Sequence, residues 1–458
     1  MSDNIQKLLH KYDRPGPRYT SYPTVPEWSD KFSPEDYIQA LKRASETNEP
    51  LSLYVHIPFC RKRCFYCGCN TTITKKPEKP ADYLLTLKRE IEIVTNQLDQ
   101  RNRLIQMHWG GGTPTYLTTE QIEWLFNEIS AKFEFLEDAE IAIEVDPRVT
   151  TTEQLELLAK LGFNRISLGV QDFNEKVQTA IGRNQTQDQT LSLFKTCREL
   201  GFNGINIDLI YGLPFQTVQN FSKSIQQVID LKTDRVAVYS YAHLPSIITH
   251  QRRIDENALP QTEQKYKLFA TAIEKFIDAG YVQIGMDHFA RSDDELALAV
   301  KNGTLHRNFM GYTTKRTSDM LGIGMSAIGD IGGSFAQNYS KLDTYMRPIA
   351  ENQNAVFRGC VLTEDDKIRR WTIISIMCNG VLDFTELEKQ FGIKYAEYFT
   401  DEDKELAEFI GDGLMERTES GLKVTAKGMI FVRNISLVFD AYMRSKRDGK
   451  TPLFSRTI

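Results

Sequence analysis

Residues 51–69 read LSLYVHIPFCRKRCFYCGC, an apolar run followed at once by four closely spaced cysteines. The run is short and nearly continuous in large apolar residues, which is typical of a buried parallel strand. Pro58 ends it, so Cys60, Cys64, Cys67 and Cys69 lie on the loop that follows the strand. The sequence therefore predicts a sheet that presents several thiols at one edge.

Outward from this stretch, short apolar runs alternate with amphipathic helical stretches between about residues 51 and 289. Such alternation favours an α/β fold with parallel strands, either a barrel or a doubly wound sheet. Three helices are expected to end in a glycine just before the next strand, at Gly162, Gly201 and Gly280. The buried parallel strands are expected at residues 53–57, 105–109, 141–145, 165–170, 205–211, 235–241 and 282–286.

The composition indicates an acidic globular chain of two or three domains. Its 458 residues include 56 Lys and Arg against 61 Asp and Glu, a formal net charge of −5. This balance argues against a nucleic-acid partner, which requires a basic excess. No apolar run approaches about 18 residues, and the first residues lack the apolar core of a signal peptide. We therefore expect a cytoplasmic protein with no membrane partner, and a monomer because no long heptad pattern occurs.

Four regions are expected along the chain. Residues 1–50 form an N-terminal arm, whose Pro- and Tyr-rich segment at 15–23 can be neither a regular helix nor a central strand. Residues 51–290 form the β/α unit, residues 291–360 form its extension and a connecting segment, and residues 361–458 form a mostly helical domain. The last region resembles a winged helix, but its 15 Lys and Arg against 17 Asp and Glu argue against DNA binding.

The crowding of four cysteines within ten residues points to metal binding, because disulfides are rare in a reducing compartment. Structural zinc normally uses CxxC pairs separated by a longer stretch, and a ferredoxin cluster uses CxxCxxC with a remote fourth cysteine. The spacing CxxxCxxC instead suits a [4Fe–4S] cluster with one iron left open. Zinc or a purely structural role is the alternative.

These motifs resemble a known family. CxxxCxxC with the aromatic Tyr66 before its third cysteine is similar to the motif of radical S-adenosylmethionine (SAM) enzymes, and a glycine triplet, 110–112, ends the next predicted strand. Further segments in order along the chain resemble the oxygen-independent coproporphyrinogen III oxidases. They are residues 17–23, 60–69, 108–114, 144–147, 169–172, 206–214 and 306–309. The resemblance implies a partial (β/α)6 TIM-like barrel with an N-terminal extended arm and a mostly helical, winged-helix-like C-terminal domain.

The resemblance also implies the cofactor residues. Cys60, Cys64 and Cys67 would bind one [4Fe–4S] cluster, whose open iron would bind SAM. One SAM would contact Tyr54, Gly111, Glu144 and Ile328, and a second would contact Tyr66, Gly112, Thr113, Gln171, Arg183, Asp208 and Ala242. Because Glu144 and Asp208 end strands, they can accept hydrogen bonds from an ammonium group and a ribose hydroxyl, respectively. The alternative for both is a capping or ion-pairing role.

Two residues are expected to be catalytic, Glu144 and Cys69. Cys69 is not expected to bind iron, since one intervening residue after Cys67 would strain chelation of a single cluster. In the resembled family this fourth cysteine accompanies the oxidases, whereas the related haem chaperones typically lack it. A haem chaperone, a radical SAM enzyme with another substrate, and a small buried thiol at Cys69 remain the alternatives.

The implied reaction removes a β-hydrogen from a propionate side chain of coproporphyrinogen III by a 5′-deoxyadenosyl radical. Loss of CO2 and one electron then leaves a vinyl group, and two such events give protoporphyrinogen IX. The substrate carboxylates require guanidinium groups beside aromatic surface, which predicts contacts with Arg18, Tyr19, Tyr22 and Arg307. The alternative is that the arm only packs over the barrel. A low-potential reductant and an electron acceptor are further partners, both unidentified.

Overall fold

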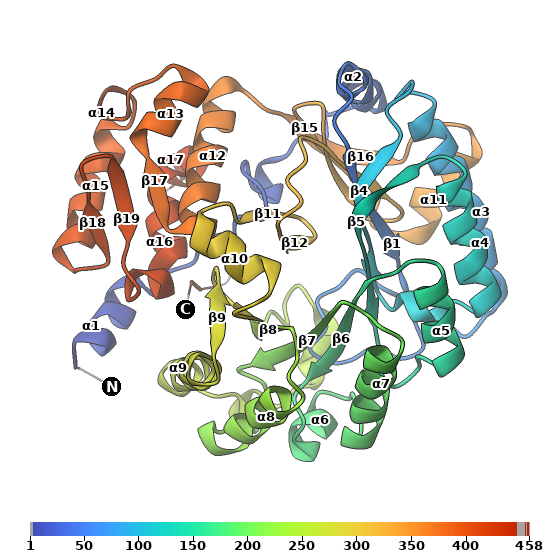
Figure 1. Ribbon diagram of the computed structural model, residues 1–458, viewed down its shortest axis with the longest axis horizontal. Coiled ribbons are helices and arrows are strands. Elements are labelled where there is room, and N and C mark those ends of the chain that lie inside the picture. Colours follow the sequence, from blue (N-terminus) through green and yellow to red (C-terminus); the bar gives the residue numbers. More distant parts are fainter. Residues whose placement is uncertain (1–2, 447–453, 455, 458) are drawn as a thin grey trace.

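The computed structural model describes residues 3–446, 454 and 456–457 of the chain. Its centre is a twelve-stranded sheet in the order β16-β15-β14-β13-β1-β4-β5-β6-β7-β8-β10-β9. Six neighbouring strands run parallel and form the curved wall seen in Figure 1. They are β1 (Leu51–Ile57), β4 (Arg103–Gly111), β5 (Glu134–Val145), β6 (Arg165–Gln171), β7 (Gly204–Tyr211) and β8 (Arg235–Ser240). The expected partial (β/α)6 barrel is confirmed.

Helices cover the outer face of this wall (Figure 1). They are α3 (Glu78–Thr95), α4 (Thr119–Ser130), α5 (Thr152–Lys160), α6 (Glu175–Ala180), α7 (Gln187–Glu199), α8 (Val218–Asp230) and α9 (Thr262–Asp278). Four of them begin with a capping box, in which a threonine side chain and the amide side chain three residues later satisfy each other's backbone donors. These pairs are Thr118 with Gln121, Thr151 with Gln154, Thr186 with Gln189, and Thr217 with Asn220.

Two strands at the edges of the parallel region differ from the sequence-based expectation. The seventh buried parallel strand was expected at 282–286. This segment overlaps β9 (Tyr281–Ile284), which pairs antiparallel with β10 (His288–Arg291) at the edge of the sheet. At the other side, β13 (Met320–Ile323) pairs parallel with β1. It was not expected, because it is short, contains a glycine and follows a polar segment. The sheet then continues antiparallel through β14 (Ile328–Ile331), β15 (Ser334–Asn338) and β16 (Val356–Val361).

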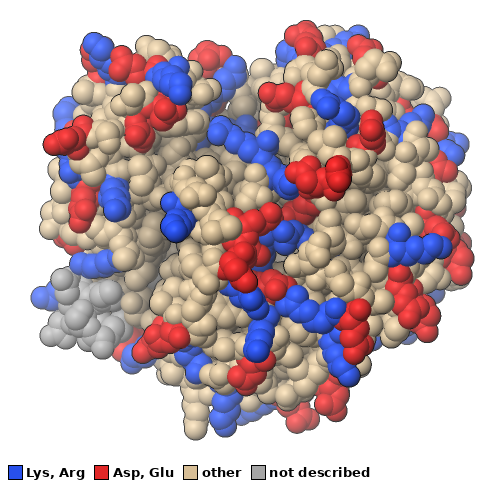
Figure 2. Space-filling model, in the orientation of Figure 1, with Lys and Arg blue, Asp and Glu red and all other residues tan. Residues whose placement is uncertain are grey.

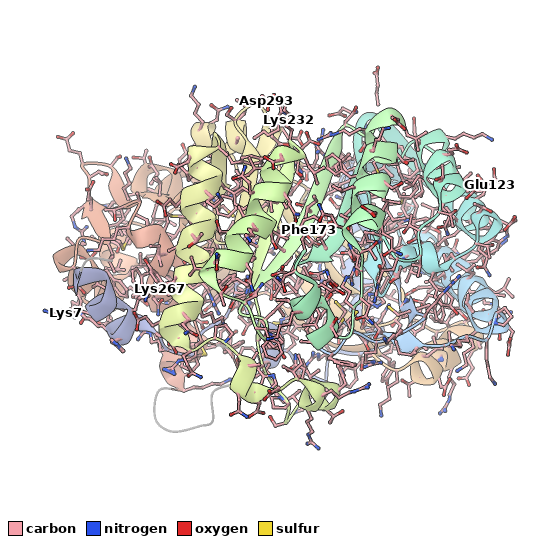
Figure 3. The ribbon with its side chains drawn as sticks, turned by 90° about the horizontal axis from the view of Figure 1, so that it is seen from below. Lys7, Glu123, Phe173, Lys232, Lys267 and Asp293 are labelled. Atoms are coloured by element: carbon pink, nitrogen blue, oxygen red, sulfur yellow. The ribbon has the colours of Figure 1, made fainter. Side chains whose placement is uncertain are left out.

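Ion pairs close the end of the barrel at which the strands begin. Arg235 Nε lies 3.0 Å from Asp294 Oδ2, its Nη2 lies 2.8 Å from Glu295 Oε1, and Arg165 Nε lies 2.7 Å from Glu140 Oε2. Figure 2 shows acidic and basic side chains side by side over this face, and in Figure 3 Lys232 and Asp293 lie together at this end of the upright helices α8 and α9. The opposite end, where the strands finish, is therefore the one available for a site.

The C-terminal domain has the element order expected of a winged helix. Its helices are α12 (Glu364–Asn379), α13 (Phe384–Phe391), α14 (Tyr395–Tyr398) and α15 (Thr400–Gly411), followed by the short α16 (Val432–Ser436) and α17 (Ala441–Ser445). A three-stranded sheet in the order β17-β19-β18 is formed by β17 (Val381–Asp383), β18 (Met415–Arg417) and β19 (Gly421–Val424). In Figure 1 this domain (orange to red) lies beside the barrel.

The first 50 residues are more than an extended arm, because helices α1 (Asp3–Tyr12) and α2 (Pro34–Ser45) flank the non-helical 15–23 segment. Tyr12, Tyr19 and Tyr22 are buried in the core of the C-terminal domain. The Arg433 guanidinium donates to the carbonyls of Gly16 and Pro17 and so holds the arm there. The arm thus fixes the C-terminal domain against the barrel.

Smaller elements complete the connections. The hairpin of β11 (His306–Asn308) and β12 (Gly311–Thr313) lies between α10 (Glu295–Asn302) and β13, and α11 (Leu342–Ala350) lies between β15 and β16. The short strands β2 (Phe59–Cys60) and β3 (Thr72–Ile73) pair on the cysteine loop. Within the described ranges, no helix has the length and apolar character needed to cross a membrane.

Candidate active site

The cysteine loop docks on the glycine-rich end of β4. Gly112 N donates to Ile57 O at 2.8 Å, and Thr113 N donates to Phe59 O at 3.0 Å. A Cβ atom on Gly112 would lie 2.6 Å from the Pro58 carbonyl oxygen, a distance that would force backbone to move. Glycine is therefore required at 112 for the two strand ends to approach this closely.

Gly111 also allows the end of β4 to lie close to β1 and the cysteine loop. Its φ angle is +117°, and a Cβ atom there would lie 2.7 Å from the His56 ring. The ring is held on its two nitrogens, by Tyr54 Oη at 3.0 Å and by Asn70 O at 3.0 Å, so it fixes the far side of the cysteine loop. The glycine triplet, which is a weak signal alone, thus has a defined packing role here.

A cavity of about 490 Å³ opens at the end of the barrel where the strands finish. Thirteen of the residues expected from the sequence to bind cofactors or to act in catalysis line it together with other side chains. They are Cys60, Cys64, Tyr66, Cys67, Cys69, Gly111, Gly112, Thr113, Glu144, Gln171, Arg183, Asp208 and Ala242. The fold thus brings together residues that are up to 182 positions apart in the sequence, from Cys60 to Ala242.

Two expected residues lie outside the lining. Tyr54 lies one layer behind it on β1, where its ring stacks on that of His108 with 6.1 Å between centroids. Ile328 begins β14, and its carbonyl lies against Gly322, the strand partner of Tyr54. Both are therefore close to the wall formed by β1 and β4.

Two guanidinium groups lie beside the Cys64 thiol. Arg183 Nη1 lies 3.7 Å from Cys64 Sγ, and Arg148 Nη2 lies 3.5 Å from the same atom. Asp146 pairs with both arginines and compensates part of their charge. Cationic donors of this kind stabilise thiolate, the form in which cysteine binds metal.

The donor set fits an iron–sulfur cluster. Cys60, Cys64 and Cys67 all line the cavity, and a hydrogen bond from Cys69 lowers the pKa of Cys67 to about 7. Among the described residues, no three His, Cys, Asp or Glu side chains converge on one point as ligands of a single metal ion. A cluster does not require such convergence, since each thiolate binds a different iron.

Glu144 ends β5 beside the glycine triplet. Its carboxylate lies 3.2 Å from His108 Nε2 and accepts from Gly111 N at 3.3 Å. Burial opposes ionisation, but these partners outweigh it and hold the pKa of Glu144 below its usual value. The side chain is therefore an anion that faces the cavity next to the cysteine loop.

Asp208 lies within β7, three residues before the strand ends, and forms no ion pair with Lys or Arg among the described residues. It accepts hydrogen bonds from Asn206 Nδ2 at 2.7 Å and from Ser167 Oγ at 3.2 Å. Burial, with a smaller contribution from the Glu144 charge, raises its pKa to about 6. At pH 7 the Asp208 carboxyl is mostly ionised, and burial of this charge without a cation lowers the stability of the protein in the absence of a ligand. The charge is therefore available to pair with a ligand.

Sequence reasoning missed the loop after β8. His250 Nε2 lies 2.7 Å from Cys67 O, and Gln251 Nε2 donates to Tyr66 O at 3.0 Å and to Ala242 O at 3.1 Å. This loop therefore holds the far end of the cysteine loop from the opposite side of the cavity. Nothing in its sequence, Thr249–Arg253 with its neighbours, has a spacing that marks such a role.

The residues expected to bind substrate lie apart from the main cavity. Arg18 forms an ion pair with Asp287, and Arg307 Nη1 donates to Arg18 O at 2.6 Å. Tyr19 and Tyr22 are only 4% and 1% exposed, and Tyr19 Oη donates to Asp440 Oδ2 at 2.9 Å. In this structure the two tyrosines are buried in the core of the C-terminal domain, whereas the alternative for the arm had it pack over the barrel.

Comparison with known proteins agrees with this arrangement. The sequence profile of the "Radical SAM superfamily" matches residues 54–228, and that of the "HemN C-terminal domain" matches residues 362–431. The fold and the thiol-lined cavity thus define a radical SAM enzyme.

Full-length relatives narrow the class. The chain is 47% identical to an oxygen-independent coproporphyrinogen III oxidase of Escherichia coli strain K12 and 43% identical to one of Pseudomonas aeruginosa, each over 98% of both chains. A solved structure, described as coproporphyrinogen III oxidase (HemN) from Escherichia coli, matches with a TM-score of 0.90 and 46% identity, covering 93% of this chain and 97% of that one. The chain belongs to the family of oxygen-independent coproporphyrinogen III oxidases.

The raised pKa of Asp208 predicts a pH-dependent stability difference. The native protein holds this proton up to about pH 6, whereas the unfolded chain releases it near 3.8. Wild-type protein therefore loses stability as pH rises from about 4 to 6, and Asp208→Asn does not. Without cofactors, we expect Asp208→Asn to be more stable by about 1–2 kcal/mol above pH 7.

Urea unfolding at several pH values measures this difference. The advantage of Asp208→Asn is expected to vanish below about pH 4, where both forms are neutral. An advantage that stays constant from pH 4 to 8 would contradict the assignment of a buried, unpaired carboxylate.

Proposed function

We propose that this protein converts two propionate side chains of coproporphyrinogen III to vinyl groups without O2, giving protoporphyrinogen IX. One observation carries the proposal: Cys60, Cys64 and Cys67 line a single cavity with Glu144 and Asp208 in a chain that matches named oxidases over its full length. Relatives from three genera are named oxygen-independent coproporphyrinogen III oxidases. This agreement favours the enzyme over a haem chaperone built on the same barrel.

The thiolates of Cys60, Cys64 and Cys67 would hold one [4Fe–4S] cluster. When bound, the cluster and SAM supply a 5′-deoxyadenosyl radical that removes a hydrogen atom from a propionate side chain of the substrate. The chain's own contribution begins with charge. Arg148 and Arg183 donate to Cys64 Sγ and stabilise the thiolate, and Asp146 orients both guanidinium groups.

Two sets of residues support binding of two SAM molecules. One set lies on the β1–β5 side, where Glu144 can accept from the ammonium group of SAM and Gly111 lines the cavity beside it. The other lies on the β6–β8 side, where Asp208 can accept from ribose hydroxyls and Arg183 is within reach. Tyr66, Gln171 and Ala242 complete this second set, together with Gly112 and Thr113.

Carboxylates of the substrate are proposed to bind near the arm. Arg18 lines a small cavity of about 50 Å³ that shares Ser240 with the main cavity. Arg307 Nε is buried and has no hydrogen-bond partner among the described residues, so a donor is available beside Arg18. A propionate group that displaced Asp287 from Arg18 would gain charge-assisted hydrogen bonds.

Cys69 is proposed to act on substrate rather than to bind iron. Its side chain is exposed at the cavity, whereas Cys64 is buried. Its hydrogen bond to Cys67 keeps it protonated, with a pKa raised above the usual value. A thiol at this place on the cavity wall, beside the residues that would hold the cluster, can contact a bound substrate and position it.

We also propose the setting in which the protein works. Free thiols and an oxygen-sensitive cluster suit the cytoplasm, where disulfides are not maintained. A monomer would be sufficient, since the cavity is lined by residues of one chain. The proposed partners are a low-potential reductant and an electron acceptor, with neither nucleic acid nor membrane.

An anaerobic turnover assay tests the function. Iron–sulfur-reconstituted protein, a chemical reductant, SAM and coproporphyrinogen III are incubated, and the products are oxidised to porphyrins and separated by fluorescence-detected chromatography. We expect protoporphyrin only when SAM is present. SAM cleavage without any change in coproporphyrinogen would mean a radical SAM enzyme with another substrate.

Cys69→Ser separates iron binding from catalysis. We expect the variant to keep its cluster absorbance and to lose at least about 100-fold in the rate of vinyl formation, in the range of losses measured when one group that acts on the reacting centre is removed. Cys67→Ser is expected to lose the cluster itself. Cys360→Ser, a partly exposed cysteine outside the cavity, is the matched control. Unchanged turnover in Cys69→Ser would leave this thiol with no catalytic role.

A further inference from the structure

The cysteine loop and the segment after it carry an unusual charge. Between Phe59 and Pro80 there are six Lys and Arg residues and one acidic residue, Glu78, in a chain whose net charge is −5. Five of the six basic side chains are exposed, and we call them the basic patch. They are Arg61, Lys62, Lys75, Lys76 and Lys79.

The fold gathers the basic patch beside a cluster ligand. Strand β2 pairs parallel with β3, so Cys60 lies opposite Ile73, and Thr74 N donates to Cys60 O at 3.3 Å. Tyr116 Oη donates to Thr74 O at 3.0 Å and fixes the second segment. Arg61 and Lys62 follow one strand and Lys75 and Lys76 follow the other, so the two basic segments lie next to each other.

The basic patch has no internal compensation. Across the described residues, none of its five side chains forms an ion pair, whereas exposed lysines on the outer helices do, as Lys267 does with Glu263 at 2.8 Å. Ile73, two residues before Lys75, is 40% exposed, and Glu78 is the one acidic residue of the stretch. Exposed side chains that are predominantly of one sign are typical of a surface that attracts a partner of opposite charge.

A second opening leads from the basic patch to the cluster loop. A depression of about 120 Å³ is lined by Cys60, Arg61, Lys62, Thr113, Tyr116, Asp146, Arg148 and Val149. Cys60 lines this depression and the main cavity as well. The depression shares Lys62, Thr113, Asp146 and Arg148 with the main cavity as well, and it opens Cys60 to the side of the loop that carries Arg61 and Lys62.

We propose that the basic patch is the docking surface for an acidic one-electron carrier protein that reduces the cluster. One electron passes from the reduced carrier to the cluster, and no bond is made or broken. The inference rests on the proposed function, because only a redox centre at Cys60 gives the surface this use. Nucleic acid fits less well, since five charges on a net acidic chain give weak counterion release.

The test uses a variant matched in number and type of substitutions. Lys75→Gln, Lys76→Gln and Lys79→Gln are combined in one protein, and Lys160→Gln, Lys195→Gln and Lys223→Gln, exposed on α5, α7 and α8, are combined in the control. The probe is an acidic plant-type [2Fe–2S] ferredoxin, a low-potential one-electron carrier. Binding of the oxidised probe to the cluster-loaded enzyme is measured by calorimetry, and cluster reduction by stopped-flow absorbance.

At about 20 mM salt we expect the patch variant to bind the ferredoxin and to accept electrons at least about tenfold more weakly than wild type, with the control within about twofold. The difference is expected to disappear near 0.5 M salt because exposed charges are then screened. Dithionite-driven SAM cleavage, which needs no docking, is expected to be equal in all three proteins.

Two results would overturn the proposal. They are equal ferredoxin binding by the patch variant and wild type at low salt, and binding of a duplex oligonucleotide at the patch more tightly than ferredoxin. If dithionite drives no SAM cleavage in any of the proteins but the patch-dependent binding remains, the proposed function fails while the docking surface stands. The two failures are therefore distinguishable.

Discussion

The close approach of Gly112 to the Pro58 carbonyl is the constraint on which the site depends. The two strand ends are joined by hydrogen bonds from Gly112 N and Thr113 N, and the 2.6 Å available to a Cβ atom excludes any side chain there. A similar limit holds at Gly110, where a Cβ atom would lie 2.9 Å from Glu144 Oε1. Three strands thus meet around a glycine triplet, and the cysteine loop, the backbone of β4 and the Glu144 carboxylate face one cavity as a result.

Charge within the cavity is arranged in two regions. Arg148 and Arg183 with Asp146 lie at the thiol end, where excess positive charge favours thiolate. Glu144 and Asp208 lie along the strand ends without a Lys or Arg ion-pair partner among the described residues, where negative charge suits a sulfonium cofactor with an ammonium group. Burial of the Asp208 charge lowers the stability of the protein without its ligands. Such a loss is common at residues that are retained for ligand binding.

The sequence predicted the parallel strands well because each is a short run of mostly apolar residues, many of which are buried in the core. It failed at the edges, where β9 is half-buried and antiparallel and β13 has four residues, one of them a glycine. Local pattern does not encode which strand a short segment will pair with. The same limit explains the helices of the first 50 residues, which stay in place by packing against distant parts of the chain.

For the site, spacing within one segment was sufficient to identify the cysteines, the glycine triplet and the strand-end carboxylates. It could not identify His250 and Gln251, which reach the cysteine loop from 183 and 185 residues away. Nor could it show that Tyr19 and Tyr22 of the arm are buried in the core of the C-terminal domain. Such distinctions depend on tertiary contacts alone.

The central claim is that this chain delivers a radical to the propionate side chains of coproporphyrinogen III. Transfer of isotope tests it most directly: substrate deuterated at the propionate β-carbons is turned over anaerobically, and the 5′-deoxyadenosine formed is analysed by mass spectrometry. The account predicts deuterium in 5′-deoxyadenosine in proportion to vinyl groups formed. Vinyl formation with unlabelled 5′-deoxyadenosine would contradict it.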